Sequence, residues 1–497
     1  MKLSPQSLRR SLWLGLILLP FAPFVGVSQE NDVSRLVTAI LSDTPLEEDL
    51  QMLTDVIGGR ATGSARNVKS VEWGLQRFRD ADIDVRKEAF TMPMLWLEEF
   101  SSAEITGDVA FSPRVVAMPF SAATSATGVT AVLRDGGFGT EKDFGKLGDK
   151  VKGSFVLIET HELRDLDGLF REYNEAVAIE RRAFAASTAG VVYMASRPHG
   201  LLYRHNASLN VDNKHPMLIM EREEAMRALR LLRSGKNLSI TARISIKSGG
   251  SYQSYNVIGE IKGSDKPNEF VVIGAHLDSW DLGSGALDNG CNVALVIDIA
   301  RQMKRLGIKP KRTIRFALWN GEEQGLYGSF GYTLTHAAEL GGHVMASSYD
   351  IGSGAITGFF TGGRPEVAAA VDRALEPVRG LGPFINVDAP IVGTDNYDFM
   401  MQGIANLVAN QASANYGPNY HARSDTYDKV DLVQLRRNAA IAAAVSWGFA
   451  NMDVTWVRQS RAQLEELIRT TDLKDQMIAF GVWKGWENGT RGRVDKK

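Results

Sequence analysis

The chain has 497 residues, of which 44% are hydrophobic and 23% are charged. This is enough to bury a large core and to form more than one domain. Its 56 basic and 58 acidic residues leave a formal net charge of -2, so no general electrostatic attraction to nucleic acid or an anionic membrane is expected. Cys291 is the single cysteine of the sequence, which excludes an intrachain disulfide.

Residues 1–28 are predicted to form a secretory signal peptide. Three basic residues precede an apolar run over 12–27, and small residues lead to a cleavage site near Ser28. A membrane anchor is the alternative, but Pro20 and Pro23 interrupt the roughly 20 apolar residues that a spanning helix needs. We therefore expect an exported protein, periplasmic or secreted, without stable membrane insertion.

An α/β domain is expected to begin after this segment. Apolar residues recur at helical spacing over 46–80, around the turn-like sequence GGRATGS, and an alternating run follows over 83–92. From about Ser102 the pattern changes to short alternating stretches separated by glycine and aspartate. We expect the first part of the main domain over 29–101 and an inserted β-rich domain over 102–250.

The α/β pattern returns after residue 250. Strand, helix and strand follow one another at the length of a parallel crossover. The expected elements are strands over 270–275, 313–319 and 343–349, and helices over 292–306 and 436–451. The second part of the main domain is therefore predicted over 251–454. The charged, partly helical tail over 455–497 is predicted to be peripheral.

Residues that can bind a metal ion lie where these strands end. His276 and Asp288 follow one predicted strand, in HLDSWD and GALDNG, and Glu322 and Glu323 follow the next, in LWNGEEQG. The carboxyl ends of parallel strands form the ligand crevice of an open sheet, so these residues can meet there. Alone, Asp288 could be a turn residue and the glutamates a helix start. Together with a histidine they suit a zinc site.

The spacing also suggests roles for the neighbours of these residues. Asp278 would share a strand face with His276, and it could accept the imidazole N–H that a metal does not use. Two adjacent glutamates cannot point the same way, so one can bind metal while the other faces water. We expect Glu323 to be the ligand and Glu322 the general base.

Other catalytic motifs are absent from the sequence. It contains no HExxH, so the single-zinc helix motif is excluded. It contains no GxSxG, which argues against an α/β-hydrolase serine mechanism. The glycines over 283–290 do not form a GxGxxG or a P-loop motif.

The motifs HLDSWD, GALDNG and LWNGEEQG resemble those of the di-zinc exopeptidase family that includes the bacterial leucyl aminopeptidases. The resemblance extends from about residue 46 to residue 452, through GGRATGS, GTD at 393–395 and HARSDT at 421–426. It implies a mixed, mainly parallel sheet flanked by helices, the zinc exopeptidase fold. The segment 102–250 resembles a protease-associated domain, a module that supplies no zinc ligand.

The resemblance implies two zinc ions per chain. In this family pattern one ion is held by His276 and Asp350, the other by Glu323 and His421, Asp288 bridges both, and Glu322 is the base. Without the resemblance, Asp350 would be a turn aspartate and His421 a loop histidine. The sequence departs from the pattern at Asn289, where some relatives carry an aspartate, and in the composition of 416–423.

The resemblance therefore implies an exported zinc-dependent aminopeptidase or dipeptidase. It would hydrolyse short peptides with a free N-terminus through a metal-activated water. A carboxypeptidase or amidohydrolase on the same site is the alternative. A non-catalytic binding protein is disfavoured because the ligand set is complete.

The charge of the binding site decides which terminus of the substrate it recognises. An aminopeptidase needs acceptors for the substrate ammonium, and a carboxypeptidase needs a cation for the carboxylate. Asp395 and Arg423 are candidates for these opposite tasks. The expected partner is the short peptide substrate. The sequence is also compatible with a homodimer.

Overall fold

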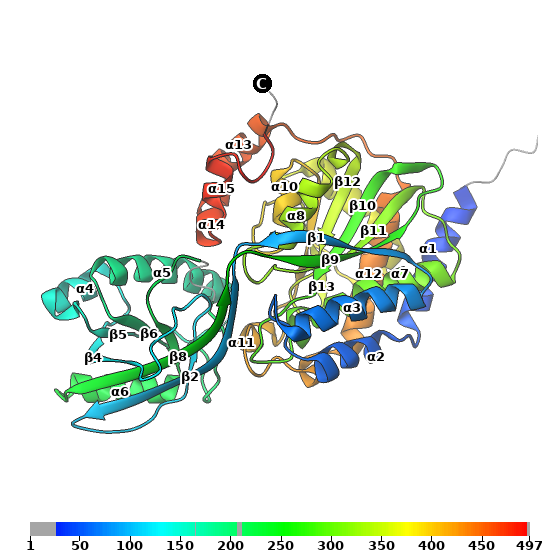
Figure 1. The fold of residues 1–497 in the computed structure, drawn as a ribbon. Coiled ribbons are helices and arrows are strands. Elements are labelled where there is room, and N and C mark those ends of the chain that lie inside the picture. The colour runs from blue at the N-terminus through cyan, green and yellow to red at the C-terminus, as the bar shows by residue number, and fades with distance from the viewer. Residues whose placement is uncertain (1–25, 165, 206–210, 495–497) are drawn as a thin grey trace, which may run out of the picture.

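The computed structural model describes residues 26–164, 166–205 and 211–494. Most of the predicted signal peptide therefore lies outside the described residues, and helix α1 (Gly26–Leu41) begins at its end. The described chain forms two domains, each built on its own seven-stranded sheet (Figure 1). In these residues we find no helix that is both long and apolar enough to cross a membrane.

The larger domain contains the sheet β1-β9-β11-β10-β12-β14-β13. Its strands are β1 (Asp84–Met92), β9 (Tyr252–Ile261), β10 (Lys266–His276), β11 (Arg312–Trp319), β12 (His343–Ser348), β13 (Ile356–Phe360) and β14 (Asn406–Gln411). The four central strands are parallel, and the outer strands add antiparallel pairs. The mixed sheet predicted from the sequence is confirmed. Its parallel centre brings the ends of β10, β11 and β12 to one edge.

Helices cover both faces of this sheet. They are α2 (Leu46–Gln51), α3 (Ala65–Asp80), α7 (Cys291–Arg305), α8 (Tyr327–Thr335), α9 (Pro365–Leu375), α10 (Asn396–Met401), α11 (Tyr416–Asn419) and α12 (Leu432–Asn451). Helix α7 is buried over most of its length because the sheet and the helices α1, α2 and α12 all contact it, in agreement with the apolar run over 293–297 of its sequence. On the other face, Tyr332 and Phe399 pack against Trp319.

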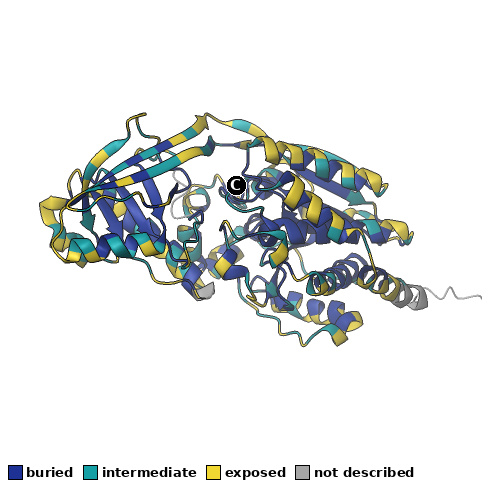
Figure 2. Ribbon diagram, turned by 90° about the horizontal axis from the view of Figure 1, so that it is seen from below, coloured by how far each residue is buried: buried dark blue, intermediate teal, exposed yellow. Residues whose placement is uncertain are grey.

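The smaller domain is inserted between β1 and β9. Its sheet, β2-β8-β4-β5-β6-β7-β3, contains β2 (Leu95–Gly107), β3 (Val115–Ala117), β4 (Val129–Asp135), β5 (Phe155–Ile158), β6 (Gly190–Met194), β7 (Met217–Met220) and β8 (Leu238–Gly249). Helices α4 (Glu141–Leu147), α5 (Leu166–Ala185) and α6 (Arg222–Arg233) accompany it. The sheet begins at Leu95, before the predicted boundary at 102, because the alternating pattern continues into β2. Each domain has its own buried core (Figure 2).

A two-stranded ribbon joins the domains, because β1 leads into β2 and β8 leads into β9 (Figure 1). The C-terminal segment adds α13 (Arg461–Thr470), α14 (Leu473–Ala479) and α15 (Trp483–Glu487). An ion pair between Arg491 and Asp398 of α10, 2.6 Å long and almost fully buried, anchors this segment to the main domain. Helix α14 also contacts α5 of the inserted domain. The tail predicted to be peripheral thus packs on the main domain and also contacts the inserted domain.

Candidate metal centre and its cavity

Three neighbouring parallel strands bring the predicted ligands to one edge of the main sheet. His276 is the last residue of β10, Glu322 and Glu323 follow β11, and Asp350 follows β12. Parallel strands end side by side, so residues separated by about 70 positions become neighbours. Two further residues join them from loops: Asp288 from the segment before α7, and His421 from the segment after α11.

The two histidines face the two oxygens of the Asp288 carboxylate. His276 Nε2 lies 3.2 Å from Asp288 Oδ1 and 2.9 Å from Asp350 Oδ1. His421 Nε2 lies 3.3 Å from Asp288 Oδ2 and 2.9 Å from Glu323 Oε2. The five side chains thus form two groups that share Asp288. This is the grouping that the family resemblance implies for two ions.

The chemistry of these side chains fits divalent cations. His276, Asp288 and Glu323 each offer one ligand atom, and these atoms lie within 4.8 Å of one another. Burial, with the negative charges nearby, raises the pKa of Glu322 well above its usual value and that of Glu323 to about 7. Crowded, buried carboxylates of this kind are stabilised by a cation among them. Imidazole nitrogens and carboxylate oxygens are ordinary zinc ligands.

Glu322 lies beside both groups and lines the cavity above them. Its carboxylate Oε2 is 3.9 Å from His276 Nε2, further than the oxygens of Asp288 and Asp350. The side chain therefore faces the cavity next to the candidate ions. This is where the predicted general base would meet a water molecule.

Asp278 supports the site in a different way from the one predicted. Strand β10 ends at His276, so the alternation of faces does not extend to Asp278. Its main-chain carbonyl accepts the His276 Nδ1–H at 3.0 Å, whereas its carboxylate is 3.7 Å away. That carboxylate accepts hydrogen bonds from Thr62 Oγ1 at 2.6 Å and from the Glu322 main-chain N–H at 3.4 Å. Asp278 thus connects the histidine to the segment that carries Glu322.

Asp425 supports the loop that carries Asp288, and the sequence patterns did not single it out. Its buried carboxylate accepts hydrogen bonds from the main-chain N–H groups of Ala286, Leu287 and Asp288, at 3.0, 2.6 and 3.1 Å. These bonds fix the loop that presents Asp288, in which the Asp288-Asn289 peptide is cis. Burial raises the pKa of Asp425 to about 7. The available signal was its position in the motif HARSDT.

A cavity of about 140 Å³ lies over the metal-ligand cluster. Three separate parts of the chain form its wall. The main domain contributes apolar side chains such as Phe360 and Val392, α5 of the inserted domain contributes Tyr173, and the C-terminal segment contributes Phe480. The aromatic ring of Phe480 stacks on Tyr173 with ring centroids 5.2 Å apart. The walls are therefore largely apolar, and the floor carries the carboxylates and histidines.

The two residues expected to recognise substrate charge lie in different environments. Asp395 is buried at the start of α10, and its neighbours Thr394 and Asn396 line the cavity. Arg423 is exposed and does not line the cavity, because its side chain leaves the His421 segment toward the surface. The structure thus brings Asp395 beside the cavity and leaves Arg423 outside it.

Comparison with known proteins identifies the class. Residues 256–446, which contain most of the main sheet and all six residues of the candidate site, match the model of peptidase family M28. The protein is a metallopeptidase, and the matched residues of its main domain resemble this family. The motifs also predict a likeness to carboxypeptidase Q, and the human protein of that name is 26% identical over 416 residues, covering 82% of this chain and 85% of the relative.

Other relatives agree with this assignment. A probable lipoprotein aminopeptidase of Mycobacterium tuberculosis is 27% identical over 470 residues, covering 86% of this chain and 87% of the relative. The crystal structure of a peptidase M28 precursor from Shewanella amazonensis is similar, with a TM-score of 0.78 and 27% identity, over 87% of this chain and all of that one. A zinc aminopeptidase from Bacillus subtilis shares the fold, with a TM-score of 0.65 and 21% identity, over 83% and 97% of the two chains.

Proposed function

We propose that this metallopeptidase is an exported, zinc-dependent exopeptidase that acts on the free amino terminus of short peptides. The observation that carries the choice of terminus is the charge of the cavity. Among the described residues that line it, no lysine or arginine occurs, and the four carboxylates are those of three candidate zinc ligands and of Glu322. A substrate carboxylate would lack a cationic side chain to bind it, and this disfavours recognition of a free carboxyl terminus.

Two of the relatives support this proposal through their names. The Bacillus subtilis protein is called a zinc aminopeptidase, and the Mycobacterium tuberculosis protein a probable lipoprotein aminopeptidase. Carboxypeptidase Q, by its name, represents the alternative activity. Export is proposed from the signal-like sequence of residues 1–28.

The proposed mechanism assigns a separate task to each side chain. Two zinc ions would be held by His276, Asp350, Glu323, His421 and the shared Asp288. Zinc, when bound, supplies Lewis-acid polarisation of the scissile carbonyl. Glu322 accepts a proton from the attacking water and then donates it to the nitrogen of the leaving amine. Glu322 suits this exchange because it lines the cavity and is not one of the five predicted ligands.

The choice of terminus is tested with blocked dipeptides. The pure, zinc-loaded protein is assayed with three forms of one dipeptide. The first has both termini free, the second has an acetylated amino terminus, and the third has an amidated carboxyl terminus. We expect acetylation to abolish cleavage and amidation to be tolerated. The reverse pattern would establish the carboxypeptidase alternative.

The base is tested with Glu322→Gln, which keeps the volume of the side chain and removes its ability to accept a proton. Activity is expected to fall by roughly a hundredfold or more, with zinc content unchanged. Glu466→Gln, on the exposed surface of α13, is the control and should behave as the wild type. Near-normal turnover of Glu322→Gln would rule out Glu322 as the base.

A further inference from the structure

The inserted domain contacts the predicted zinc ligand His421 directly. The main-chain carbonyl of Arg204 accepts the Nδ1–H of His421 at 3.1 Å, and the main-chain N–H of Arg204 donates to the His421 carbonyl at 3.0 Å. One step further, the N–H of Arg423 donates to the carbonyl of Leu202 at 3.0 Å. The two segments therefore pair like antiparallel strands, although they belong to different domains.

This pairing decides which nitrogen of His421 can bind a metal. Because Nδ1 donates its proton to the carbonyl of Arg204, the lone pair on Nε2 faces Glu323 and Asp288. The main chain of His421 is in the left-handed region, with φ 55°. A non-glycine residue keeps this conformation where its surroundings impose it. The hydrogen bonds from the main chain of Arg204 impose this conformation on His421.

The side chain of Arg204 fastens this segment to both domains. It is 2% exposed. Its Nε and Nη2 donate to the two carboxylate oxygens of Asp281, in the main domain, at 2.9 and 3.1 Å. Its Nη1 pairs with Glu98 of β2 and donates to the carbonyl of Ala117 at 2.8 Å. The planar guanidinium thus joins both domains at the residue whose carbonyl holds His421.

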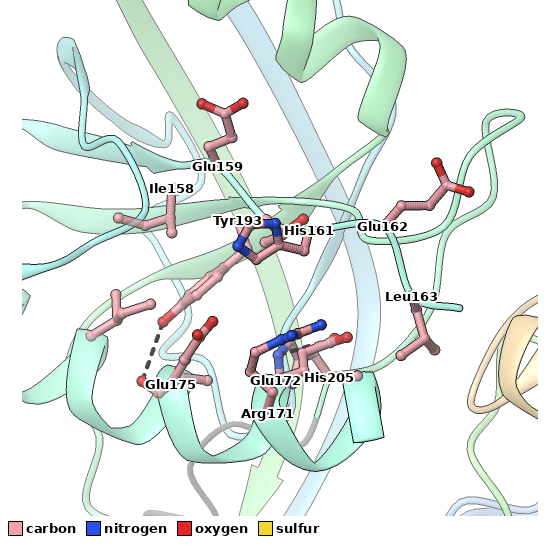
Figure 3. A pocket seen from close by; sticks show the side chains of 14 residues that line it. Ile158, Glu159, His161, Glu162, Leu163, Arg171, Glu172, Glu175, Tyr193 and His205 are labelled. Atoms are coloured by element: carbon pink, nitrogen blue, oxygen red, sulfur yellow. Dashed lines mark hydrogen bonds and ion pairs between the residues drawn. The ribbon is translucent and has the colours of Figure 1, made fainter. Parts of the chain in front are cut away.

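A buried network of hydrogen bonds and ion pairs inside the inserted domain also supports the segment that contains Arg204. Glu172 of α5 accepts hydrogen bonds from Tyr203 OH at 2.8 Å and Ser196 Oγ at 2.9 Å, and it pairs with Arg197 at 3.2 Å. Figure 3 shows Glu172 beside His205 among the residues that line a pocket next to α5, and their closest atoms are 3.2 Å apart. That pocket holds about 30 Å³, room for about two water molecules. We therefore interpret these groups as a scaffold and not as a binding site.

We infer that the inserted domain positions His421 for zinc, and that Arg204 is the positioning residue through which it does so. This inference rests on the proposed two-zinc site. The two histidines differ in their support: His276 donates Nδ1–H to the carbonyl of Asp278 in its own domain, and His421 donates to the inserted domain. Loosening the inserted domain should therefore weaken the ion held by His421 and Glu323, and leave the other ion in place.

The test is Arg204→Lys in the full-length protein, because lysine keeps the charge and loses the fork that binds Asp281 and Glu98 together. Zinc binding is measured by titration against a competing chelator, which gives the affinity of each ion. We expect one of the two affinities to fall by roughly tenfold to a hundredfold and the other to be unchanged.

The matched control is Arg233→Lys. Arg233 also pairs with one aspartate and one glutamate, Asp135 and Glu159, but all three lie within the inserted domain and away from His421. Both zinc affinities of this control should equal those of the wild type. The unfolding temperature of each zinc-free variant shows whether a lost ion reflects lost positioning or general loss of structure.

A milder variant keeps the inference testable if Arg204→Lys does not fold. Glu98→Gln weakens the same clamp from the inserted-domain side, and Glu159→Gln is its control. Wild-type affinity for both ions in a folded Arg204→Lys or Glu98→Gln protein would overturn the inference, as would an equal loss of both ions. A wild-type protein that binds fewer than two ions would instead contradict the proposed two-zinc site, before any variant is made.

Discussion

Asp288 is the side chain on which both groups of predicted ligands converge. Each of its oxygens faces a different histidine. In Asp288→Ala a negative charge shared by two candidate ions is lost, so zinc binding should be impaired at both positions. His276→Ala removes a ligand from one group alone. We expect the zinc content of Asp288→Ala to fall below that of His276→Ala.

Elemental analysis of the dialysed proteins measures this difference. The exposed Asp265→Ala serves as the control for the loss of a carboxylate. Full zinc occupancy in Asp288→Ala would remove the bridging role from Asp288.

The main chain of Asp278, and not its side chain, contacts His276. This changes the expected effect of substituting Asp278. Because the carbonyl of Asp278 holds His276, Asp278→Asn leaves that hydrogen bond in place. The variant instead weakens the acceptor for Thr62 and for the main chain of Glu322. We expect a change in zinc affinity below the tenfold that losing a histidine partner commonly costs, together with reduced turnover.

Turnover and chelator competition, measured on the same preparation, separate these two effects. Thr62→Val removes the hydroxyl donor to the same carboxylate and should reproduce part of the loss in turnover. A loss of zinc affinity of tenfold or more in Asp278→Asn, with normal turnover at saturating zinc, would restore the role predicted from the sequence.

At the scale of single residues, the sequence could predict the local part of the site. His276, Asp288, Glu322 and Glu323 follow strand ends, so their positions follow from hydrophobic patterning and the topology of a parallel sheet. Asp425 could not be found in this way, because it bonds to a loop 137 to 139 positions earlier in the chain. Such contacts depend on tertiary packing and leave no periodic signal.

At the scale of elements, the apolar strands and helices of the main domain were predictable. The strand expected over 270–275 lies within β10, and the helix expected over 292–306 matches α7 to within one residue at each end. The contribution of α14 was not predictable. Its amphipathic sequence indicates a helix, but nothing in that pattern says that the next residue, Phe480, reaches the cavity between two domains.

Helix α14 closes one side of the cavity. The Gln476 side chain accepts a hydrogen bond from the Val392 main-chain N–H at 2.8 Å, and this holds the helix against the cavity wall. Phe480 stacks on Tyr173, whose hydroxyl lies 2.5 Å from that of Tyr420. These contacts join the C-terminal segment, the inserted domain and the main domain around the cavity. We propose that this side of the cavity limits the length of a substrate peptide.

We expect Phe480→Ala to widen this side of the cavity and to favour longer peptides. The ratio of kcat/KM for a tetrapeptide to that for a dipeptide with the same first residue should rise by roughly fivefold, the equivalent of about 1 kcal/mol for one aromatic contact. Ile478→Ala, on the same helix but 46% exposed, is the control and should leave the ratio unchanged. An unchanged ratio in Phe480→Ala would show that α14 does not limit peptide length.

At the scale of the whole molecule, the inserted domain supplies none of the six residues of the candidate site, all of which lie between 276 and 421. The sequence predicts from this that the insert controls access and leaves zinc binding to the main domain. The structure gives it two further tasks, since Arg204 holds His421 and Tyr173 forms part of the cavity wall. The inserted domain, which contributes no zinc-ligating side chain, can therefore still determine how many zinc ions the site binds.

Removing residues 95–249 tests this division of labour. Met92 and Tyr252 are paired in the antiparallel β1-β9 ladder, so joining residue 94 to residue 250 closes that ladder with a short hairpin turn. A truncated protein that retains the helix and strand content of the main domain, measured by circular dichroism, should keep the ion of His276 and Asp350 and lose most of its affinity for the second. With the wall at Tyr173 gone, it should also lose its discrimination between short and long peptides. Two ions bound at the affinity of the full-length protein would show that the main domain positions His421 by itself.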